Sequence, residues 1–218
     1  MDIEQHPMYQ MLSDLRRDFH SNPELSRQEH RTTARIKEIL ASLGIKLQPL
    51  DIPTGAVGLV TGKTPGKTLG IRADIDALPM QELNEVSYRS KTDGIMHSCG
   101  HDAHNTVLLG VAHKLVESGL ADRMKGQVKL IFQPAEEVAT GARDMIAAGV
   151  MKNPDIDWML ALHTWPYLEA GHIGLYKGVS HAAADMFELK IVGKGAHGCT
   201  PHVAIDPIVA GAQFVSSL

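Results

Sequence analysis

The amino-acid sequence predicts an α/β fold built on a mostly parallel sheet. Apolar runs of strand length alternate with segments of helical apolar spacing along most of the 218 residues. The apolar fraction of 44% and the charged fraction of 21% are typical of a globular chain and not of a disordered one. In sheets of this kind, sites form outside the carboxyl ends of the strands, so polar residues that follow a strand are the first candidates for chemistry.

The composition argues against several classes of function. A net charge of −4 and the lack of a long basic run do not favour nucleic acid or an anionic membrane surface as a partner. The polar residues 1–6 predict no signal peptide, and no apolar run is long enough to predict a membrane span. Only Cys99 and Cys199 are present, so we expect no disulfide framework and a reducing, cytoplasmic setting.

Two helices are predicted at the start of the chain. The first covers roughly residues 7–20. The second covers roughly 27–43, because Ser26 and Glu29 form a capping-box pattern and Gly44 fits a C-terminal cap. Three strands follow, near residues 46–52, 57–62 and 68–73.

The middle of the chain continues the alternation of helix and strand. A helix is predicted over residues 103–117, where apolar side chains recur with helical spacing. A second helix is predicted near residues 140–149. The short apolar runs 128–132 and 158–162 are predicted to be buried strands.

The sequence changes character after about residue 180. Residues 185–192 alternate like a half-exposed strand, a glycine-rich turn follows at 193–198, and a helix then starts with Pro207 in its first turn. One strand and one helix cannot bury a core alone. We therefore interpret residues 1–182 as one domain and 183–218 as the beginning of a smaller α+β domain.

The segment Met96–His104 combines a thiol with several imidazoles where a loop enters a helix. Taken singly, a cysteine is usually an apolar filler and a histidine near a helix start is often a cap. The cluster favours Cys99 and His101 as metal ligands, because thiolate and imidazole bind zinc, cobalt, nickel and, less typically, manganese. We interpret His97 and His104 as groups beside the ligands or, for His104, on the helix surface.

Two later segments place matching groups at strand ends. Glu136 and Glu137 follow a predicted strand and Pro134, which is a costly place for two carboxylates unless something uses them. Since neighbouring side chains point in different directions, one can bind metal while the other faces a water that the ion acidifies. His163 follows five apolar residues, and we interpret it as a ligand rather than a core histidine.

Asp74 and Asp76 lie at the end of another predicted strand, where they face the same side. They can orient histidine ligands through hydrogen bonds or touch a metal directly. We favour the orienting role for both.

The second domain contributes His197, which lies in the glycine-rich turn. It is either a turn histidine without a role or a hydrogen-bond donor to a substrate oxygen that becomes an oxyanion. Cys199 has no second soft ligand near it in the sequence and is interpreted as inert. The other histidines are interpreted as surface or packing groups: His6, His20, His30, His113, His172, His181 and His202.

Four motifs in this order resemble those of the co-catalytic metallopeptidase superfamily of amidohydrolases. The branch is similar to hippurate hydrolase, N-acyl-amino-acid amidohydrolase and the plant auxin-conjugate hydrolases. The resemblance covers essentially the whole chain. The motifs are Ile71–Pro79, Met96–His104, Gln133–Glu137 and His163–Pro166.

This resemblance implies a catalytic domain with a two-metal site and hydrolysis of the amide bond of an N-acyl amino acid, for example a benzoyl or acetyl derivative. The implied metal ligands are Cys99, His101, Glu137 and His163, and the implied general base is Glu136. The ions are divalent, with manganese, zinc, nickel and cobalt all open. The second domain is implied to be a lid that forms a homodimer, in which His197 assists the partner's active site.

Two features depart from the family pattern. Residues 138–142 stand where a glycine run often follows the paired glutamates. Family members also continue with the rest of the lid and a return to the catalytic domain that carries a final histidine ligand. The alternatives to the enzyme are therefore a truncated, inactive fragment that only binds metal, or a related peptidase or desuccinylase.

Overall fold

The computed structural model describes residues 3–179, 182–183, 185 and 187–218. It divides into two compact units, Met1–Tyr167 and Leu168–Leu218. The domain boundary between residues 182 and 183 stays a prediction. His181 and Met186, which entered the sequence interpretation, lie outside the described residues.

The first unit contains a five-stranded sheet with the strand order β1-β2-β4-β3-β5. Its strands are β1 (Lys46–Leu47), β2 (Ala56–Thr61), β3 (Thr64–Asp74), β4 (Lys125–Gln133) and β5 (Trp158–Ala161). β3 is parallel to both β4 and β5, whereas β2 is antiparallel to β4 and to β1. All strands except β2 therefore share one direction, which confirms the mostly parallel α/β sheet.

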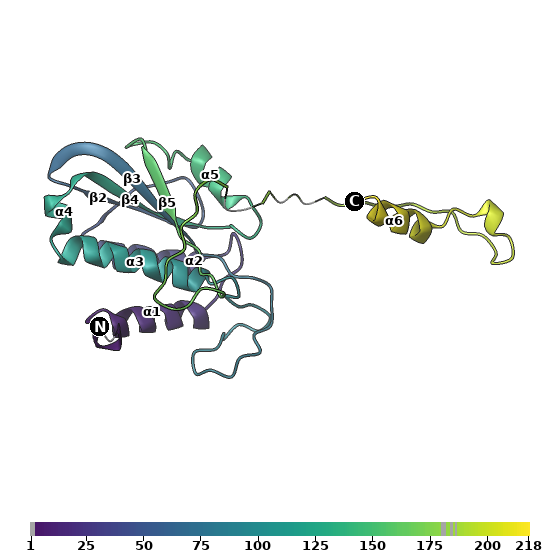
Figure 1. The fold of residues 1–218 in the computed structure, drawn as a ribbon, viewed down its shortest axis with the longest axis horizontal. Coiled ribbons are helices and arrows are strands. Elements are labelled where there is room, and N and C mark those ends of the chain that lie inside the picture. The colour runs from purple at the N-terminus through teal and green to yellow at the C-terminus, as the bar shows by residue number, and fades with distance from the viewer. Residues whose placement is uncertain (1–2, 180–181, 184, 186) are drawn as a thin grey trace. The chain divides into compact units, whose positions relative to one another are not determined.

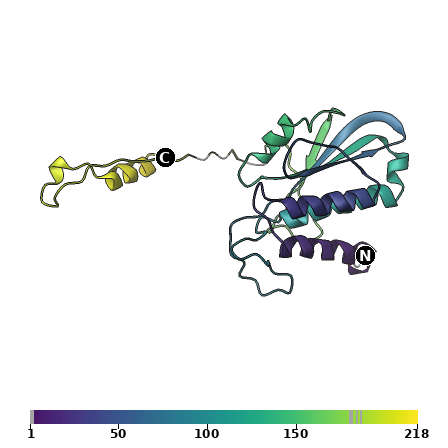
Figure 2. The ribbon, with the colours of Figure 1, turned by 180° about the vertical axis from the view of Figure 1, so that it is seen from behind.

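Helices cover both faces of this sheet (Figure 1). The helices α2 (His30–Ser42) and α3 (His101–Glu117) lie on one face and α5 (Gly141–Ala147) lies on the other. The 3₁₀-helix η1 (Ile3–Gln5) packs on α1 (Tyr9–Ser21), and α1 and α4 (Leu120–Arg123) pack on α3. Phe19 of α1, Ile36 of α2 and Leu109 of α3 belong to one core with Leu130 of β4. Met145 of α5 packs with Ile131 in a second cluster. Figure 2 shows α1 and α2 side by side from behind. Among the described residues, no helix is both long and apolar enough to cross a membrane.

β4 is buried on both faces because its apolar side chains alternate between the two cores. Leu130 and Phe132 belong to the larger cluster and Ile131 to the smaller one. Lys129 interrupts this run and is fully buried. Its Nζ donates to the carbonyl oxygens of Val150, Lys152 and Pro154 at 2.9, 2.8 and 3.0 Å. A single buried ammonium thus fastens the segment that leads into β5.

The predicted capping box at Ser26 and Glu29 is wrong. Neither side chain caps α2. The backbone amides of Arg31 and Thr32 donate instead to the carboxylate of Glu24, at 2.9 and 2.8 Å. An acid placed before the first turn satisfies the free amides and opposes the helix dipole. Ser26 and Glu29 are therefore free to bond elsewhere.

The strand predicted over residues 158–162 forms as β5, but its side chains are exposed rather than buried. Among the described residues, β5 pairs with β3 alone and lies at the edge of the sheet. An apolar run predicts a strand without showing whether that strand is central or at an edge. The strand predicted near 46–52 shortens to β1, between Pro49 and the preceding turn, since proline cannot donate to a ladder.

The second unit contains a short 3₁₀-helix, η2 (Pro201–Val203), and the helix α6 (Pro207–Ser216). The predicted helix start is confirmed, with the Asp206 side chain accepting from the amide of Ile208 at 2.9 Å. The strand predicted over 185–192 is not seen in residues 187–192, and an isolated bridge joins Lys194 to Ile205 instead. A strand needs a neighbour for its ladder, and the described part of this unit supplies one bridge only.

We expect Lys129→Met to lower the free energy of unfolding by about 2 kcal/mol, because it leaves buried carbonyl groups without a donor. Chemical denaturation measures the change. Lys152→Met is the matched control, since the Lys152 ammonium is exposed and pairs with Asp155, which is also exposed. Equal stability of the two variants would show that the three carbonyl bonds of Lys129 contribute nothing net.

Candidate metal centre

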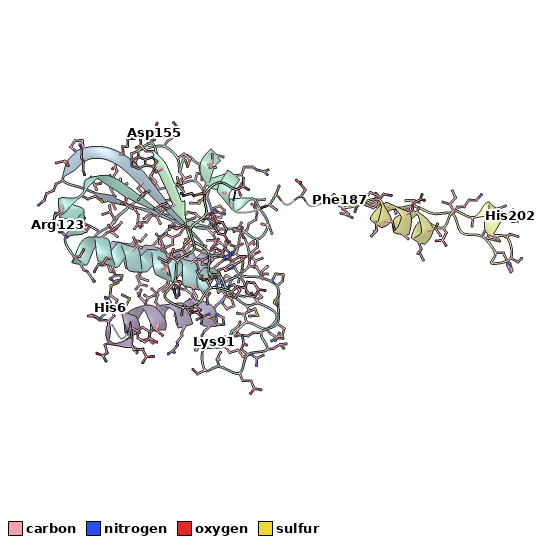
Figure 3. The ribbon with its side chains drawn as sticks, viewed as in Figure 1. His6, Lys91, Arg123, Asp155, Phe187 and His202 are labelled. Carbon is pink, nitrogen blue, oxygen red and sulfur yellow. The ribbon has the colours of Figure 1, made fainter. Side chains whose placement is uncertain are left out.

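The register of the sheet gathers the polar segments at the carboxyl ends of its strands. Asp74, the last residue of β3, lies beside Gln133, the last residue of β4. The amide of Ile75 donates to the carbonyl oxygen of Gln133 at 3.0 Å, so the two chains leave the sheet together. In Figure 3, Arg123 marks the opposite end of the sheet, just before the first residue of β4, and Lys91 lies in the loop between β3 and α3.

Three overlapping sets of metal-ligating groups form at the carboxyl ends of the strands, and one of them joins Asp74, His101 and His104. Ligand atoms of Cys99, His101 and His163 all lie within 4.8 Å of one another. Ligand atoms of His101, Glu136 and Glu137 meet the same limit. The structure thus brings together all four ligands and the general base that the resemblance implies, from three separate segments of the chain.

His101 belongs to all three sets and is almost fully buried. Its Nε2 lies 3.7 Å from Glu137 Oε1 and 3.8 Å from Glu136 Oε2, and neither ring nitrogen has a hydrogen-bond partner. Its Nδ1 is 3.3 Å from Asp76 Oδ1. Burial lowers the pKa of His101, but the carboxylates of Asp76 and Asp74 outweigh burial and raise it. The ring is therefore surrounded by more negative charge than it can neutralise.

His163 presents a lone pair toward Cys99. Its Nδ1–H donates to the carbonyl oxygen of Thr164 at 2.8 Å, which leaves Nε2 as the unprotonated nitrogen of the neutral ring. Nε2 lies 3.5 Å from Cys99 Sγ. A backbone bond that fixes the tautomer in this way is typical of histidines that bind metal.

His104 is close to these groups but has no free nitrogen. Its Nδ1–H donates to Asp74 at 2.6 Å, and its Nε2 accepts from the amide of Thr164 at 2.9 Å. Asp74 also pairs with Arg72 at 2.7 Å. Burial raises the pKa of Asp74, but the bond from His104 and the charge of Arg72 outweigh it and lower that pKa to about 2. His104 therefore links Asp74 to the turn that follows His163.

The donor groups fit a divalent metal ion. Burial, and then the negative charge of Glu137, raises the pKa of the Cys99 thiol to about 12. Burial also raises the pKa of Glu137, whose Oε1 is buried without a partner. A cation between these groups would compensate the negative charge and accept the unshared electron pairs. Thiolate, imidazole and carboxylate together suit zinc, cobalt or nickel best.

His97 and His197 are placed differently. His97 is buried, both its nitrogens lack hydrogen-bond partners, and burial lowers its pKa to about 4, so the ring is neutral. His197 belongs to the second unit, where its Nδ1 lies 2.9 Å from the Cys199 thiol. Cys199, interpreted as inert, thus has a partner within its own turn. The role of His197 toward the metal centre stays a prediction.

Sequence reasoning missed a buried network beneath the start of α3. His20 Nδ1 bonds Asp102 at 2.6 Å, and His20 Nε2 bonds Glu82 at 3.0 Å. Arg16 pairs with the same Asp102 oxygen at 2.9 Å. The bond to Asp102 raises the pKa of His20, burial lowers it, and the bond to Glu82 raises it again, with a net rise. This network fixes the helix turn that presents His101.

The fold and this donor set define a class of α/β proteins that hold metal at the carboxyl edge of a sheet. The family described as "Peptidase family M20/M25/M40" matches residues 70–218. The chain belongs to this family.

Several known proteins are similar to this chain. The N-acetyl-L-cysteine deacetylase of Bacillus subtilis (strain 168) is 43% identical over 207 residues, which are 95% of this chain and 49% of that protein. The N-acyl-L-amino acid amidohydrolase of Geobacillus stearothermophilus is 43% identical over 204 residues, covering 93% and 54%. The Bacillus subtilis YXEP protein, described as a dinuclear metal binding peptidase from the M20 family, superposes with a TM-score of 0.74 at 40% identity, covering 78% and 47%. The chain thus spans about half the length of these relatives.

The stability of the chain should depend on pH through His20. Because its pKa is raised above the ordinary value of 6.5, its contribution is fully present below pH 6.5 and is lost as the pH rises through the higher folded value. We expect His20→Gln to lower the free energy of unfolding by about 3 kcal/mol near pH 5.5, and by progressively less at higher pH. Denaturation of both proteins across this range measures the difference, with His113→Gln on the α3 surface as the control. A deficit independent of pH would show that His20 does not change charge.

Cys99→Ala should reduce metal affinity by about 100-fold or more, since removing a ligand costs at least as much as removing a group that only touches ligands. Elemental analysis after equilibration with zinc or cobalt measures the bound metal. Cys199→Ala is the matched control, because the second cysteine lies in the other compact unit. Metal content equal to that of the unmodified chain would exclude Cys99 as a ligand.

Proposed function

We propose that this chain carries the metal centre of an amidohydrolase that cleaves the amide bond of N-acyl amino acids. The observation that carries the proposal is the convergence of Cys99, His101, Glu136, Glu137 and His163 at one edge of the sheet. Buried atoms of His101 and Glu137 lack hydrogen-bond partners there, so their electron pairs would be free to bind an ion. The names of the two amidohydrolase relatives support the substrate class.

Four side chains would hold two divalent ions: Cys99, His101, Glu137 and His163. Bound ions would supply Lewis acidity to the amide carbonyl and to the attacking water. The description of the YXEP protein as dinuclear supports the number of ions. The ions are manganese, zinc, nickel or cobalt, and the thiol of Cys99 favours the softer three over manganese.

Glu136 would act as the general base. Its side chain is 40% exposed, against 19% for Glu137, so Glu136 faces the solvent from which water and substrate enter. Glu136 takes one proton from the water, whose oxygen bonds to the carbonyl carbon. The carbon–nitrogen bond then breaks, and Glu136 returns the proton to the departing nitrogen. The products are a carboxylic acid and a free amino acid.

The second domain, residues 183–218, would serve as a lid that also joins two subunits in a homodimer. His197 would donate a hydrogen bond to the substrate oxygen as negative charge develops on it. Both cysteines are free thiols, which supports a reducing, cytoplasmic setting. No nucleic acid or membrane partner belongs to this proposal.

A second candidate within the same family is a peptidase. The description of the YXEP protein as a peptidase favours it. A dipeptide presents a charged amino group where an N-acyl amino acid presents an apolar acyl group. The two candidate functions are separated by the turnover of the purified protein on acetyl and benzoyl amino acids, compared with its turnover on dipeptides that carry the same C-terminal amino acid. Faster hydrolysis of the dipeptides would overturn the amidohydrolase assignment.

Glu136→Gln and Glu137→Gln should have opposite effects. We expect Glu136→Gln to keep metal affinity within a few fold while kcat falls by about 100-fold to 10,000-fold, because the base is lost and the ligands are not. Glu137→Gln should lose metal affinity first, with turnover partly restored at high metal concentration. Metal titration and initial rates on N-acetyl amino acids measure both effects. The reverse pattern would exchange the two roles.

A further inference from the structure

The turn that carries both glutamates has an unusual backbone. Ala135 follows β4 with φ of +50°, in the left-handed region that favours glycine. The amides of Thr140 and Gly141 both donate to the carbonyl oxygen of Ala135, at 3.3 and 3.0 Å. A Cβ on Gly141 would lie 1.6 Å from the carbonyl oxygen of Pro134, so the chain closes tightly on itself. The directions of Glu136 and Glu137 depend on this closed turn, which we call the acid turn (residues 134–141).

A buried carboxylate holds the start of the acid turn. Glu29 is fully buried, and its Oε1 accepts from the amide of Ala135 at 2.8 Å and from that of Arg27 at 3.0 Å. Its Oε2 accepts from Thr54 Oγ1 at 2.7 Å. All three partners are donors, as a carboxylate requires. Removing such a buried acceptor would leave each of the three without its bond.

The same region of the chain also holds the second half of the acid turn. Ser26 Oγ donates to Asp76 Oδ2 at 2.7 Å, and the amide of Glu137 donates to the same oxygen at 3.0 Å. The amide of Ala77 donates to the carbonyl oxygen of Glu24 at 2.8 Å, which fixes this segment beside the end of β3. The turn before α2 therefore clamps the acid turn directly through Glu29 and indirectly through Asp76.

The loop before β2 completes this support. A Cβ on Gly55 would lie 2.8 Å from Cδ of Pro134, so the two loops are in close contact. The amide of Gly55 donates to Thr33 Oγ1 at 2.8 Å. Thr54, through its bond to Glu29, and Gly55, through its contact with Pro134, leave the acid turn little room to shift.

We propose that Glu29 is a positioning residue, which fixes the amide of Ala135 and thereby sets the directions of the Glu136 and Glu137 side chains toward the metal centre. The inference rests on the proposed roles of these two glutamates. Glu29 does not reach the metal or the substrate, and it acts only through the backbone of the acid turn.

Three substitutions at Glu29 test this role by titration of the metal-free chain with Co²⁺. Glu29→Leu removes the acceptors and should weaken Co²⁺ binding by about 10-fold to 100-fold. Glu29→Gln retains an acceptor for Ala135 and can donate to the Thr54 hydroxyl, so it should bind Co²⁺ within about 3-fold of the unmodified chain. Glu29→Asp keeps the charge but moves the carboxylate away from its partners by one methylene. Its Co²⁺ affinity should be lower than that of Glu29→Gln and higher than that of Glu29→Leu. If the leucine variant does not fold, the comparison of the aspartate and glutamine variants tests the role.

Glu24→Leu is the matched control. Glu24 lies in the same turn and also accepts from two backbone amides, but those amides belong to α2. This variant should lose stability and keep its Co²⁺ affinity. Unchanged affinity in both the leucine and the aspartate variants of Glu29 would overturn the proposal, and so would an equal loss in Glu24→Leu.

Amide hydrogen exchange provides a readout that needs neither metal nor substrate. Glu29→Leu, or Glu29→Asp in its place, should accelerate exchange in residues 134–141 while β4 keeps its protection, and Glu24→Leu should not. If the unmodified chain binds no Co²⁺ or hydrolyses no N-acyl amino acid, the proposed function fails, and exchange alone decides the positioning role. Unchanged exchange in the acid turn would then reject it.

Discussion

The parallel pairing of β3 with β4 determines where most charged groups of the candidate metal centre lie. Asp74 stands beside Gln133 in this register, so both strands end at the same level and their acidic turns leave the sheet side by side. A slip of one residue would turn every side chain of β4 to the opposite face. Leu130 and Phe132, which anchor β4 in the larger core, therefore also fix the position of the acids that follow. The apolar packing of the sheet therefore sets the geometry of the site, because the carboxylates of the site repel one another and cannot hold it together themselves.

Several carboxylates near the centre serve to hold backbone or imidazole groups rather than to bind metal. Asp74 holds His104, Asp102 holds His20, and Glu29 holds the amide of Ala135. Each is buried and each accepts from specific N–H groups, which is the condition under which a buried charge is tolerated. The result is a frame in which donor directions are set by hydrogen bonds formed before any ion arrives. A frame of this kind lowers the reorganisation that metal binding requires.

Features with a local signal were predictable from the sequence, and features that depend on distant partners were not. Cys99 and His101 are two residues apart, and the apolar run of β4 predicts a strand by itself. The capping box failed because the Ser26–Glu29 spacing is the same whether the acid faces a helix amide or a turn 106 residues away. His20 meets Asp102 across 82 residues, and no periodicity reports such a contact. The exposure of β5 also follows from its place in the sheet, which its own residues do not encode.

The negative charge around His101 would favour a cation at the candidate metal centre. Cys99, Glu136 and Glu137 place a thiol and two carboxyl groups around His101. Arg72 is already paired with Asp74, so it leaves the charge of the other acids uncompensated. An arginine turned toward Glu137 would relieve the repulsion, but it would also occupy the space and the electron pairs that an ion needs. Arg72 therefore neutralises Asp74, and the remaining negative charge around His101 would favour a divalent ion at this candidate centre.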